Sequence, residues 1–128
     1  MTDVRVALHI PFLRGGGVER MVLNLAESFL NRGVIVDLVV GERVGGPLAS
    51  LVPAGIQVVE LQARGTWDMA EKLARYLRAM KPKAVLGALT PANLAAIVAR
   101  RLSGQPTRVV ASVHTAVDIA RSTTPLRS

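Results

Sequence analysis

The stretch VRVALHIPFLRGGGVERMVLNLAESFLNRGVIVDLVV, residues 4–40, decides the fold. Its start, Val4–Ile10, is nearly continuously apolar and rich in β-branched residues, as in a strand buried on both faces of a parallel sheet. Between Val18 and Asn31 the apolar residues recur every three or four positions, which predicts an amphipathic helix. Val34–Val40 then predicts a second buried strand. A strand, a helix and a strand in this order form the crossover unit of parallel sheets.

The same alternation continues along the chain. Gly41–Gly55 contains glycines and prolines that predict a loop, and Pro82 prevents the second helix from continuing. Further strands are expected at Gln57–Leu61, Val85–Ala88 and Val109–Val113, and further helices from Asp68, the expected N-cap, to about Lys81 and from Pro91 to Leu102. We therefore predict an α/β fold, a Rossmann-like parallel sheet with helices on both faces, over residues 1–118, followed by a flexible tail over residues 119–128.

Composition excludes several classes of protein. The chain has 128 residues, of which 50% are hydrophobic and 20% charged, and this balance is typical of a single globular domain. It has no cysteine, so disulfides, thiolate nucleophiles and cysteine-zinc sites are excluded. No apolar run approaches the roughly 20 residues of a membrane span. We expect a cytoplasmic protein.

Positive charge is concentrated in the second half of the chain. The net charge is +7, and residues 62–128 hold eleven basic side chains against three acidic ones. Such a field attracts nucleic acid, phosphorylated ligands or an anionic membrane. With one Trp, one Tyr and two Phe the chain has few rings on which bases can stack, so we expect no nucleic-acid partner.

The predicted helix from Asp68 to about Lys81 has two different faces. Its apolar face carries Met69, Leu73, Leu77 and Met80, and Lys72, Arg75 and Arg78 project from the opposite side. Basic faces of this kind bind anionic lipid headgroups, although most charged helix faces are only solvated. Lys72, Arg75 and Arg78 are therefore the candidate residues for a membrane-surface contact.

Three consecutive glycines, Gly15, Gly16 and Gly17, separate the first strand from the first helix. Glycines let the backbone adopt positive φ and approach a ligand closely, and the free N–H groups at a helix start suit a phosphate. A flexible connector is the alternative. The dinucleotide fingerprint is not matched, because its third glycine position holds Arg20, and no Gly-Lys-Ser/Thr of a P-loop follows.

Ligands of such folds bind outside the carboxyl ends of the strands, where the loops Pro11–Gly17, Leu89–Pro91 and His114–Asp118 should converge. His114 at this rim is a candidate to bind a phosphate or a substrate hydroxyl or to act as a general base, and the alternative is an exposed loop histidine. His9 lies within the first strand and is expected to be a hydrogen-bonded core residue. Two isolated histidines predict no metal site.

The segments Gly15–Arg20, Met21–Leu30 and Asn31–Val40 together resemble the amino-terminal domain of family 4 (group 1) glycosyltransferases of the GT-B fold. That family typically has Gly-Gly-x-Glu-Arg, an apolar helix, Leu-x-x-Arg-Gly-His and a Val-rich strand. This chain departs from the pattern at Val34, where the family usually has His. The resemblance runs to about Asp118, and Val113-His114 is similar to the family's strand-end histidine.

The resemblance implies the acceptor-binding half of a retaining glycosyltransferase whose substrates are a nucleotide-diphosphate sugar and a sugar or lipid acceptor, with no other cofactor. It implies that Gly16 and Gly17 contact the donor phosphates through backbone N–H groups and that His114 contacts the acceptor or the transferring sugar. The family's carboxyl-terminal domain is absent from these 128 residues. We therefore expect an incomplete domain that is inactive without that domain or a partner chain, with possible contact at the inner face of the membrane. A stand-alone Rossmann-like phosphate- or dinucleotide-binding module is the alternative.

Overall fold

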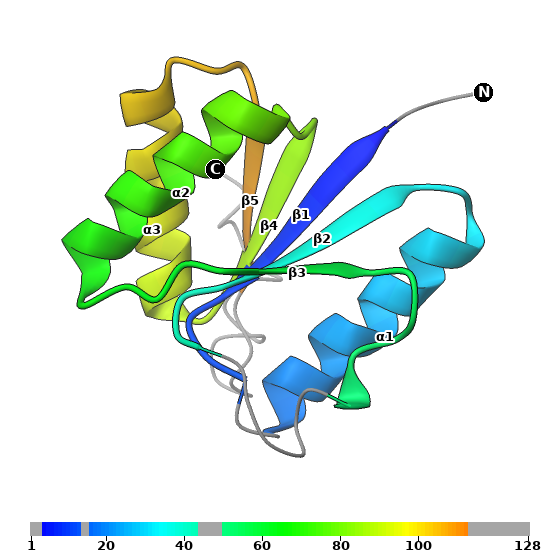
Figure 1. Ribbon diagram of the computed structural model, residues 1–128. Coiled ribbons are helices and arrows are strands. Elements are labelled where there is room, and N and C mark those ends of the chain that lie inside the picture. The colour runs from blue at the N-terminus through cyan, green and yellow to red at the C-terminus, as the bar shows by residue number, and fades with distance from the viewer. Residues whose placement is uncertain (1–3, 14–15, 44–49, 113–128) are drawn as a thin grey trace, which may run out of the picture.

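Five parallel strands form one sheet in the computed structural model, which describes residues 4–13, 16–43 and 50–112. The strands are β1 (Arg5–Ile10), β2 (Ile35–Val40), β3 (Gln57–Glu60), β4 (Ala84–Ala88) and β5 (Arg108–Ser112), in the order β3-β2-β1-β4-β5. The helices are α1 (Gly17–Asn31), α2 (Thr66–Met80) and α3 (Thr90–Ser103) (Figure 1). Every predicted strand and helix is present, with ends that differ from the prediction by one residue at most, except at the start of α2, whose N-cap lies three residues before the predicted one.

The sheet separates two apolar clusters. α2 and α3 pack together on one face, where Leu73, Leu77 and Val85 are buried, and α1 lies on the other, where Leu8, Val22 and Leu38 are buried (Figure 1). Successive residues of a strand point to opposite faces, so the strands in the middle of the sheet need apolar side chains at almost every position. The predicted parallel sheet with helices on both faces is confirmed.

The start of α2 differs from the prediction. Asp68 is not the N-cap, because the helix begins at Thr66 and Gly65 is the capping residue. Asp68 instead lies in the first turn, and its Oδ2 accepts a hydrogen bond of 2.9 Å from the backbone N–H of Arg64. A carboxylate in the first turn can therefore stabilise the start of a helix without being its N-cap, by accepting a hydrogen bond from the chain before the helix.

The helical pattern of α1 misplaces two side chains. The spacing of apolar residues along this helix predicts an exposed Glu19 and a buried Met21, but Glu19 is buried and Met21 is exposed. Glu19 is buried because its Oε1 accepts a 2.5 Å hydrogen bond from the backbone N–H of Gly16, the residue that caps α1. Local capping therefore outweighs the burial preference of the side chain.

A buried polar network connects β1, β2 and α2. Asp37 is fully buried in β2, and Nη1 of Arg5 donates to both of its carboxylate oxygens at 2.8 and 2.7 Å. The hydroxyl of Tyr76 on α2 donates to Asp37 Oδ2 at 2.5 Å. Burial, and then the neighbouring Asp37 carboxylate, raise the pKa of Tyr76, so this hydroxyl keeps its proton. The network compensates for a charge that the apolar strand would otherwise not tolerate.

The substitution Tyr76→Phe should lower the free energy of unfolding by about 1–3 kcal/mol, because it removes one donor from a buried carboxylate and leaves the ring in place. Chemical denaturation monitored by circular dichroism measures this difference. A variant as stable as the unsubstituted chain would mean that Arg5 alone satisfies Asp37.

Candidate active site

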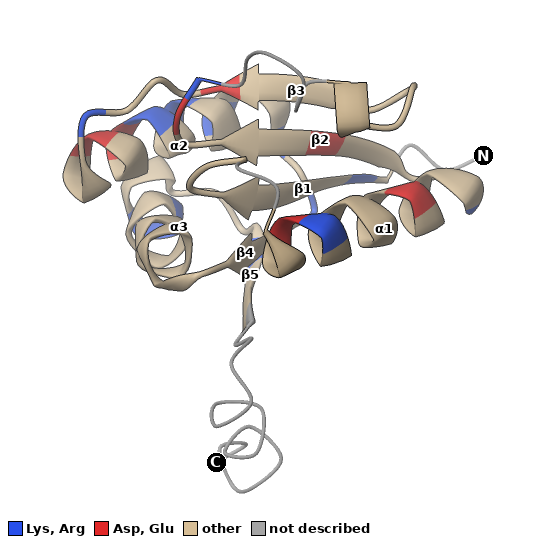
Figure 2. Cartoon of the chain, turned by 90° about the horizontal axis from the view of Figure 1, so that it is seen from below, with Lys and Arg blue, Asp and Glu red and all other residues tan. Residues whose placement is uncertain are grey.

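The carboxyl ends of the strands lie at one edge of the sheet, as the arrowheads of β1, β2 and β3 in Figure 2 show. A hollow of about 250 Å³ opens there. It is lined by the residues after β1, after β2 and after β3, by the first turn of α2 and by the start of α3: Pro11, Phe12, Gly41, Glu42, Ala63, Arg64, Gly65, Thr66, Met69 and Pro91. This edge is where ligands bind in open parallel sheets.

Sequence reasoning located only part of this hollow. It expected the loops after the first, fourth and fifth strands, and the structure brings Pro11 and Pro91 from two of them together. The third loop, His114–Asp118, lies outside the described residues, as does Gly15. The loops expected to converge did not include those after β2 and β3, which contribute Glu42 and Arg64, the ionisable side chains of this lining.

Gly41 makes the close meeting of these segments possible. A Cβ atom at this position would lie 2.5 Å from Met69 Sδ and 2.8 Å from the carbonyl oxygen of Pro11. The backbone N–H of Gly41 donates to Ile10 and its carbonyl accepts from Ala63, at 2.9 and 2.8 Å. The chain segments that leave β1, β2 and β3 are therefore joined at a residue that has no room for a side chain.

The start of α1 lies at the same edge and carries no side chain at its first two positions. Gly16 caps the helix with φ −76° and ψ 174°, and Gly17 is its first residue. The positive φ that the glycine run led us to expect is therefore not needed at Gly16. A Cβ on Gly17 would meet no atom within 4 Å, so the protein's own packing does not require glycine there. Close approach of a ligand remains a physical reason for glycine at this position.

The turn between β4 and α3 is strained. Leu89 has φ +76° and ψ 148°, a conformation that side-chain-bearing residues rarely adopt. The helix that follows packs closely on β4, because a Cβ on Gly87 would lie 2.6 Å from Asn93 Oδ1. Pro91 occupies the first turn of α3, as predicted. The strained residue and the tight packing fix the position of Pro91 at the rim of the hollow.

His9 is a core residue, as the sequence analysis expected. Its side chain is fully buried, and Nδ1 donates to the carbonyl oxygen of Val39 at 2.9 Å. This assigns the proton of the neutral ring to Nδ1. Burial lowers the pKa of His9 to about 4, against a smaller opposing effect of that hydrogen bond. His9 is therefore neutral at physiological pH.

The three candidate membrane residues lie on α2, and two of them have partners within the chain. Lys72 Nζ donates to the carbonyl oxygen of Gln62 at 2.9 Å and lies 3.2 Å from Asp68 Oδ2. Arg78 donates to the carbonyl oxygen of Leu102 near the end of α3, at 3.1 Å. Arg75 is exposed. Lys72 and Arg78 thus also connect α2 to its neighbours.

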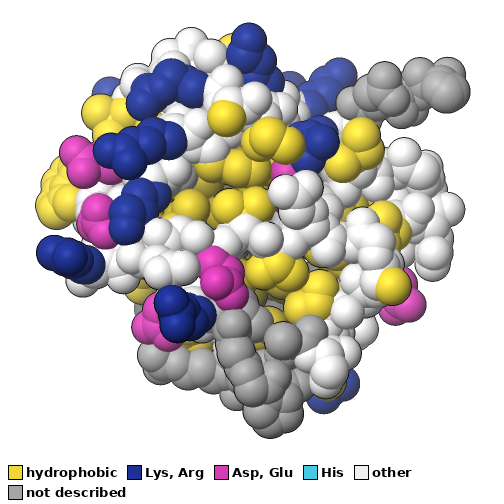
Figure 3. Space-filling view, in the orientation of Figure 1, with side chains coloured by type: hydrophobic (Ala, Val, Ile, Leu, Met, Phe, Trp, Pro, Cys, Tyr) yellow, Lys and Arg dark blue, Asp and Glu magenta, His cyan; other side chains and the backbone are white. Residues whose placement is uncertain are grey.

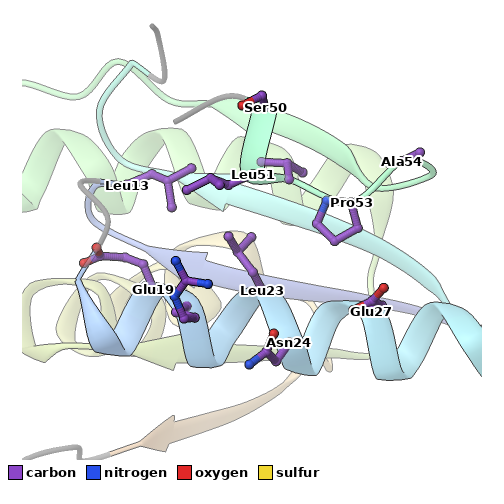
Figure 4. A pocket seen from close by; sticks show the side chains of 11 residues that line it. Leu13, Glu19, Leu23, Asn24, Glu27, Ser50, Leu51, Pro53 and Ala54 are labelled. Carbon is purple, nitrogen blue, oxygen red and sulfur yellow. The ribbon is translucent and has the colours of Figure 1, made fainter. Parts of the chain in front are cut away.

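A second hollow, of about 400 Å³, lies between α1 and residues 50–54 (Figure 4). Leu13, Leu51 and Pro53 form an apolar wall opposite α1, and α1 contributes Leu23 together with the polar Glu19, Arg20, Asn24 and Glu27. An apolar wall opposite a row of polar groups suits a ligand with one apolar and one hydroxylated face, such as a sugar ring. This hollow begins beside the start of α1.

In the part of the chain that the structure describes, no helix is long and apolar enough to cross a membrane. Over the same residues, no group of three or more His, Asp or Glu side chains has the arrangement of a metal site.

The arrangement of sheet and helices is that of one half of a GT-B glycosyltransferase. MurG from Acinetobacter baumannii superposes with a TM-score of 0.66 and 18% identity, over 93% of this chain and 39% of that chain. The lipopolysaccharide outer core galactosyltransferase WaaB superposes with a TM-score of 0.66 and 16% identity, over 91% of this chain and 35% of that chain. WbmG from Bordetella bronchiseptica, in complex with NAD and UDP, superposes with a TM-score of 0.54 and 20% identity, over 86% of this chain and 37% of that chain.

The chain belongs to glycosyltransferase family 4, whose sequence profile matches residues 15–127. No curated protein matches the sequence significantly. The chain spans less than two-fifths of the length of each of the three solved structures named above.

His9 should make stability depend on pH. Its pKa is about 4 in the folded protein and about 6.5 when unfolded, so acid protonates the unfolded state first. The free energy of unfolding should be unaffected by His9 above about pH 6.5 and fall by about 1.4 kcal/mol per pH unit from there towards pH 4. Denaturation series at successive pH values measure this slope.

The substitution His9→Gln removes the titrating group and keeps a donor for Val39. The slope between pH 6.5 and 4 should then largely disappear. Asp68 has its pKa lowered by the Arg64 amide and titrates below this range. An equal slope in both proteins would assign the acid sensitivity to other groups.

Proposed function

We propose that this chain is the acceptor-binding half of a retaining, nucleotide-sugar-dependent glycosyltransferase. Membership of family 4 supports the reaction class. The observation that carries the proposal is the start of α1, where Gly16 and Gly17 leave the backbone uncovered at the same sheet edge as the 250 Å³ hollow. A donor phosphate and an acceptor can lie next to each other there.

The donor diphosphate would bind at the first turn of α1. The N–H groups of a first turn have no partners within the helix and carry partial positive charge, which favours a phosphate. The N–H of Gly16 already donates to Glu19, so the N–H groups of Gly17 and Val18 are the donors for phosphate, and Gly16 provides close approach. Arg20, exposed one turn further along, adds positive charge.

The acceptor would bind in the hollow at the ends of β1, β2 and β3. Glu42 and Arg64 supply a carboxylate and a guanidinium to its lining, and the remaining lining is mostly backbone and apolar. An acceptor hydroxyl can hydrogen-bond to these groups while the rest of the ring packs on Phe12 and Met69. His114 would complete the rim, in contact with the acceptor or with the sugar in transfer.

We also propose that the protein contacts an anionic membrane, at the inner face of the cytoplasmic membrane, through the basic surface of α2. The concentration of cations in residues 62–128 supports this contact. The acceptor would then be a lipid-linked molecule, presented from the membrane surface.

The substitution Gly17→Val tests the donor site. The chain is titrated with nucleotide-diphosphate sugars while backbone amide shifts are recorded, and the shifts should centre on Gly17 and Val18. The valine side chain meets no atom of the protein but blocks the phosphate, so the apparent Kd should rise at least roughly tenfold. Ala79→Val, which adds the same kind of side chain at an exposed position near the end of α2 and away from this edge, is the matched control and should bind the donor normally. An unchanged affinity of Gly17→Val for the nucleotide-diphosphate sugar would mean that this loop only connects β1 to α1.

The 128 residues alone should transfer no sugar. Chemistry in a two-domain cleft needs both walls to position the donor and to exclude water. Radiolabelled nucleotide sugars with candidate acceptors measure the transfer, and robust turnover by the purified chain would contradict the proposal. Tight binding of NAD or FAD would instead favour the dinucleotide-binding alternative.

A further inference from the structure

Large apolar side chains are exposed on the outer side of α2 and α3. Trp67 at the start of α2 is 73% exposed, and Leu94 and Ile97 on α3 are 52% and 48% exposed. α2 and α3 pack against each other, and Trp67 and Leu94 line the same hollow between them, with Thr66, Ala70 and Val98. Ile97 follows Leu94 by one turn of α3 and lines a separate hollow together with Arg101. We name Trp67, Leu94 and Ile97 together the Trp67 patch.

Cations continue the same two helix faces. Arg75 lies two turns after Trp67 on α2, and Arg101 lies one turn after Ile97 on α3, and both are exposed. Residues 72–112 contain eight Lys or Arg and no Asp or Glu. Of the acidic residues on α2, Asp68 pairs with Lys72, and Glu71 is exposed between Trp67 and Arg75. Figure 3 shows Lys and Arg side chains gathered over this side of the molecule, with Asp and Glu side chains among them and hydrophobic ones at the margin.

We infer that the Trp67 patch docks on an anionic lipid bilayer, with the indole of Trp67 inserted at headgroup level and Arg75 and Arg101 against the phosphates. This inference rests on the membrane contact proposed above and names the residues that make it. A surface with an aromatic and aliphatic part beside a cationic part matches the two layers of a bilayer interface. A second copy of this chain fits less well, because it would bring Arg75 and Arg101 near the same cations.

The patch adjoins the candidate active site. Thr66 lines both the hollow at the carboxyl edge and the hollow between Trp67 and Leu94, and Pro91 lies one helical turn before Leu94. A bilayer that holds Trp67 therefore lies beside the mouth of the acceptor hollow. Only the headgroup of a lipid-linked acceptor would then need to move out of the bilayer to reach this hollow.

Trp67 is the single tryptophan of the chain, so its fluorescence reports on this position alone. Vesicles of phosphatidylcholine and phosphatidylglycerol in equal parts should shift the emission to shorter wavelength and protect it from a soluble quencher. Pure phosphatidylcholine vesicles should produce a much smaller change. Sedimentation of the same mixtures measures binding independently of the indole.

Two pairs of variants separate charge from insertion. Arg75→Gln with Arg101→Gln should weaken vesicle affinity by roughly 30-fold, and Leu94→Asn with Ile97→Asn should reduce both the affinity and the fluorescence shift. Arg32→Gln and Met21→Asn, which change an exposed cation and an exposed apolar residue on and beside α1, are the matched controls and should behave like the unsubstituted chain.

The outcomes are distinct. If the protein sediments with vesicles but the emission of Trp67 does not change, the role of the Trp67 patch is overturned and the membrane contact stands. If the protein does not sediment with vesicles, both the Trp67 patch and the membrane contact are overturned. Equal binding to neutral vesicles would overturn the role of Arg75 and Arg101. A concentration-dependent Trp67 shift without vesicles, with dimers in sedimentation velocity, would assign the patch to a second copy and overturn the inference. The donor titration at Gly17 is independent of all these results.

Discussion

The carboxylate of Asp37 lies where no water reaches it, and its need for partners holds β1, β2 and α2 in one arrangement. A buried charge without a partner costs several kcal/mol, so Arg5 and Tyr76 must both approach it. Asp37 stands opposite Ala7, two residues beyond Arg5 on the same face of the sheet, which fixes the strand register. Tyr76 fixes the rotation of α2. That rotation turns Met69 towards the hollow and leaves Trp67 on the outside.

Most of the fold could be predicted from periodicity, because strands and helices that bury apolar faces leave a regular pattern, as Val34–Val40 does. The positions of side chains that are set by a local hydrogen-bond partner, and not by this pattern, could not be predicted. Glu19 is buried because it caps Gly16, and Asp68 stabilises the start of α2 from inside the helix. The one available signal for the Asp37 network was an acidic residue in the middle of an apolar strand.

Two of the loops predicted to converge do meet at the carboxyl edge of the sheet, because parallel strands end together, but the other residues of the hollow there were only partly predictable. Gly41 follows a strand and looks like any loop glycine, and only the three-dimensional structure shows that Pro11 and Met69 occupy the space of its missing side chain. Dinucleotide-binding folds use the same edge of a parallel sheet, so the fold does not by itself identify the ligand. The choice between a glycosyltransferase half and a dinucleotide-binding module therefore depends on the glycine spacing before Arg20 and on family membership, not on the architecture of the sheet.

The position of β1 in the middle of the sheet also bears on how the chain folds. Val6 pairs with Val36 on one side and with Ala84 on the other, so the two contacts close loops of very different length. Closing the longer loop costs about 1 kcal/mol more in chain entropy. The topology therefore favours early formation of the unit β1-α1-β2, which leaves the ribosome before β4 does, with β4 joining the opposite side of β1 later.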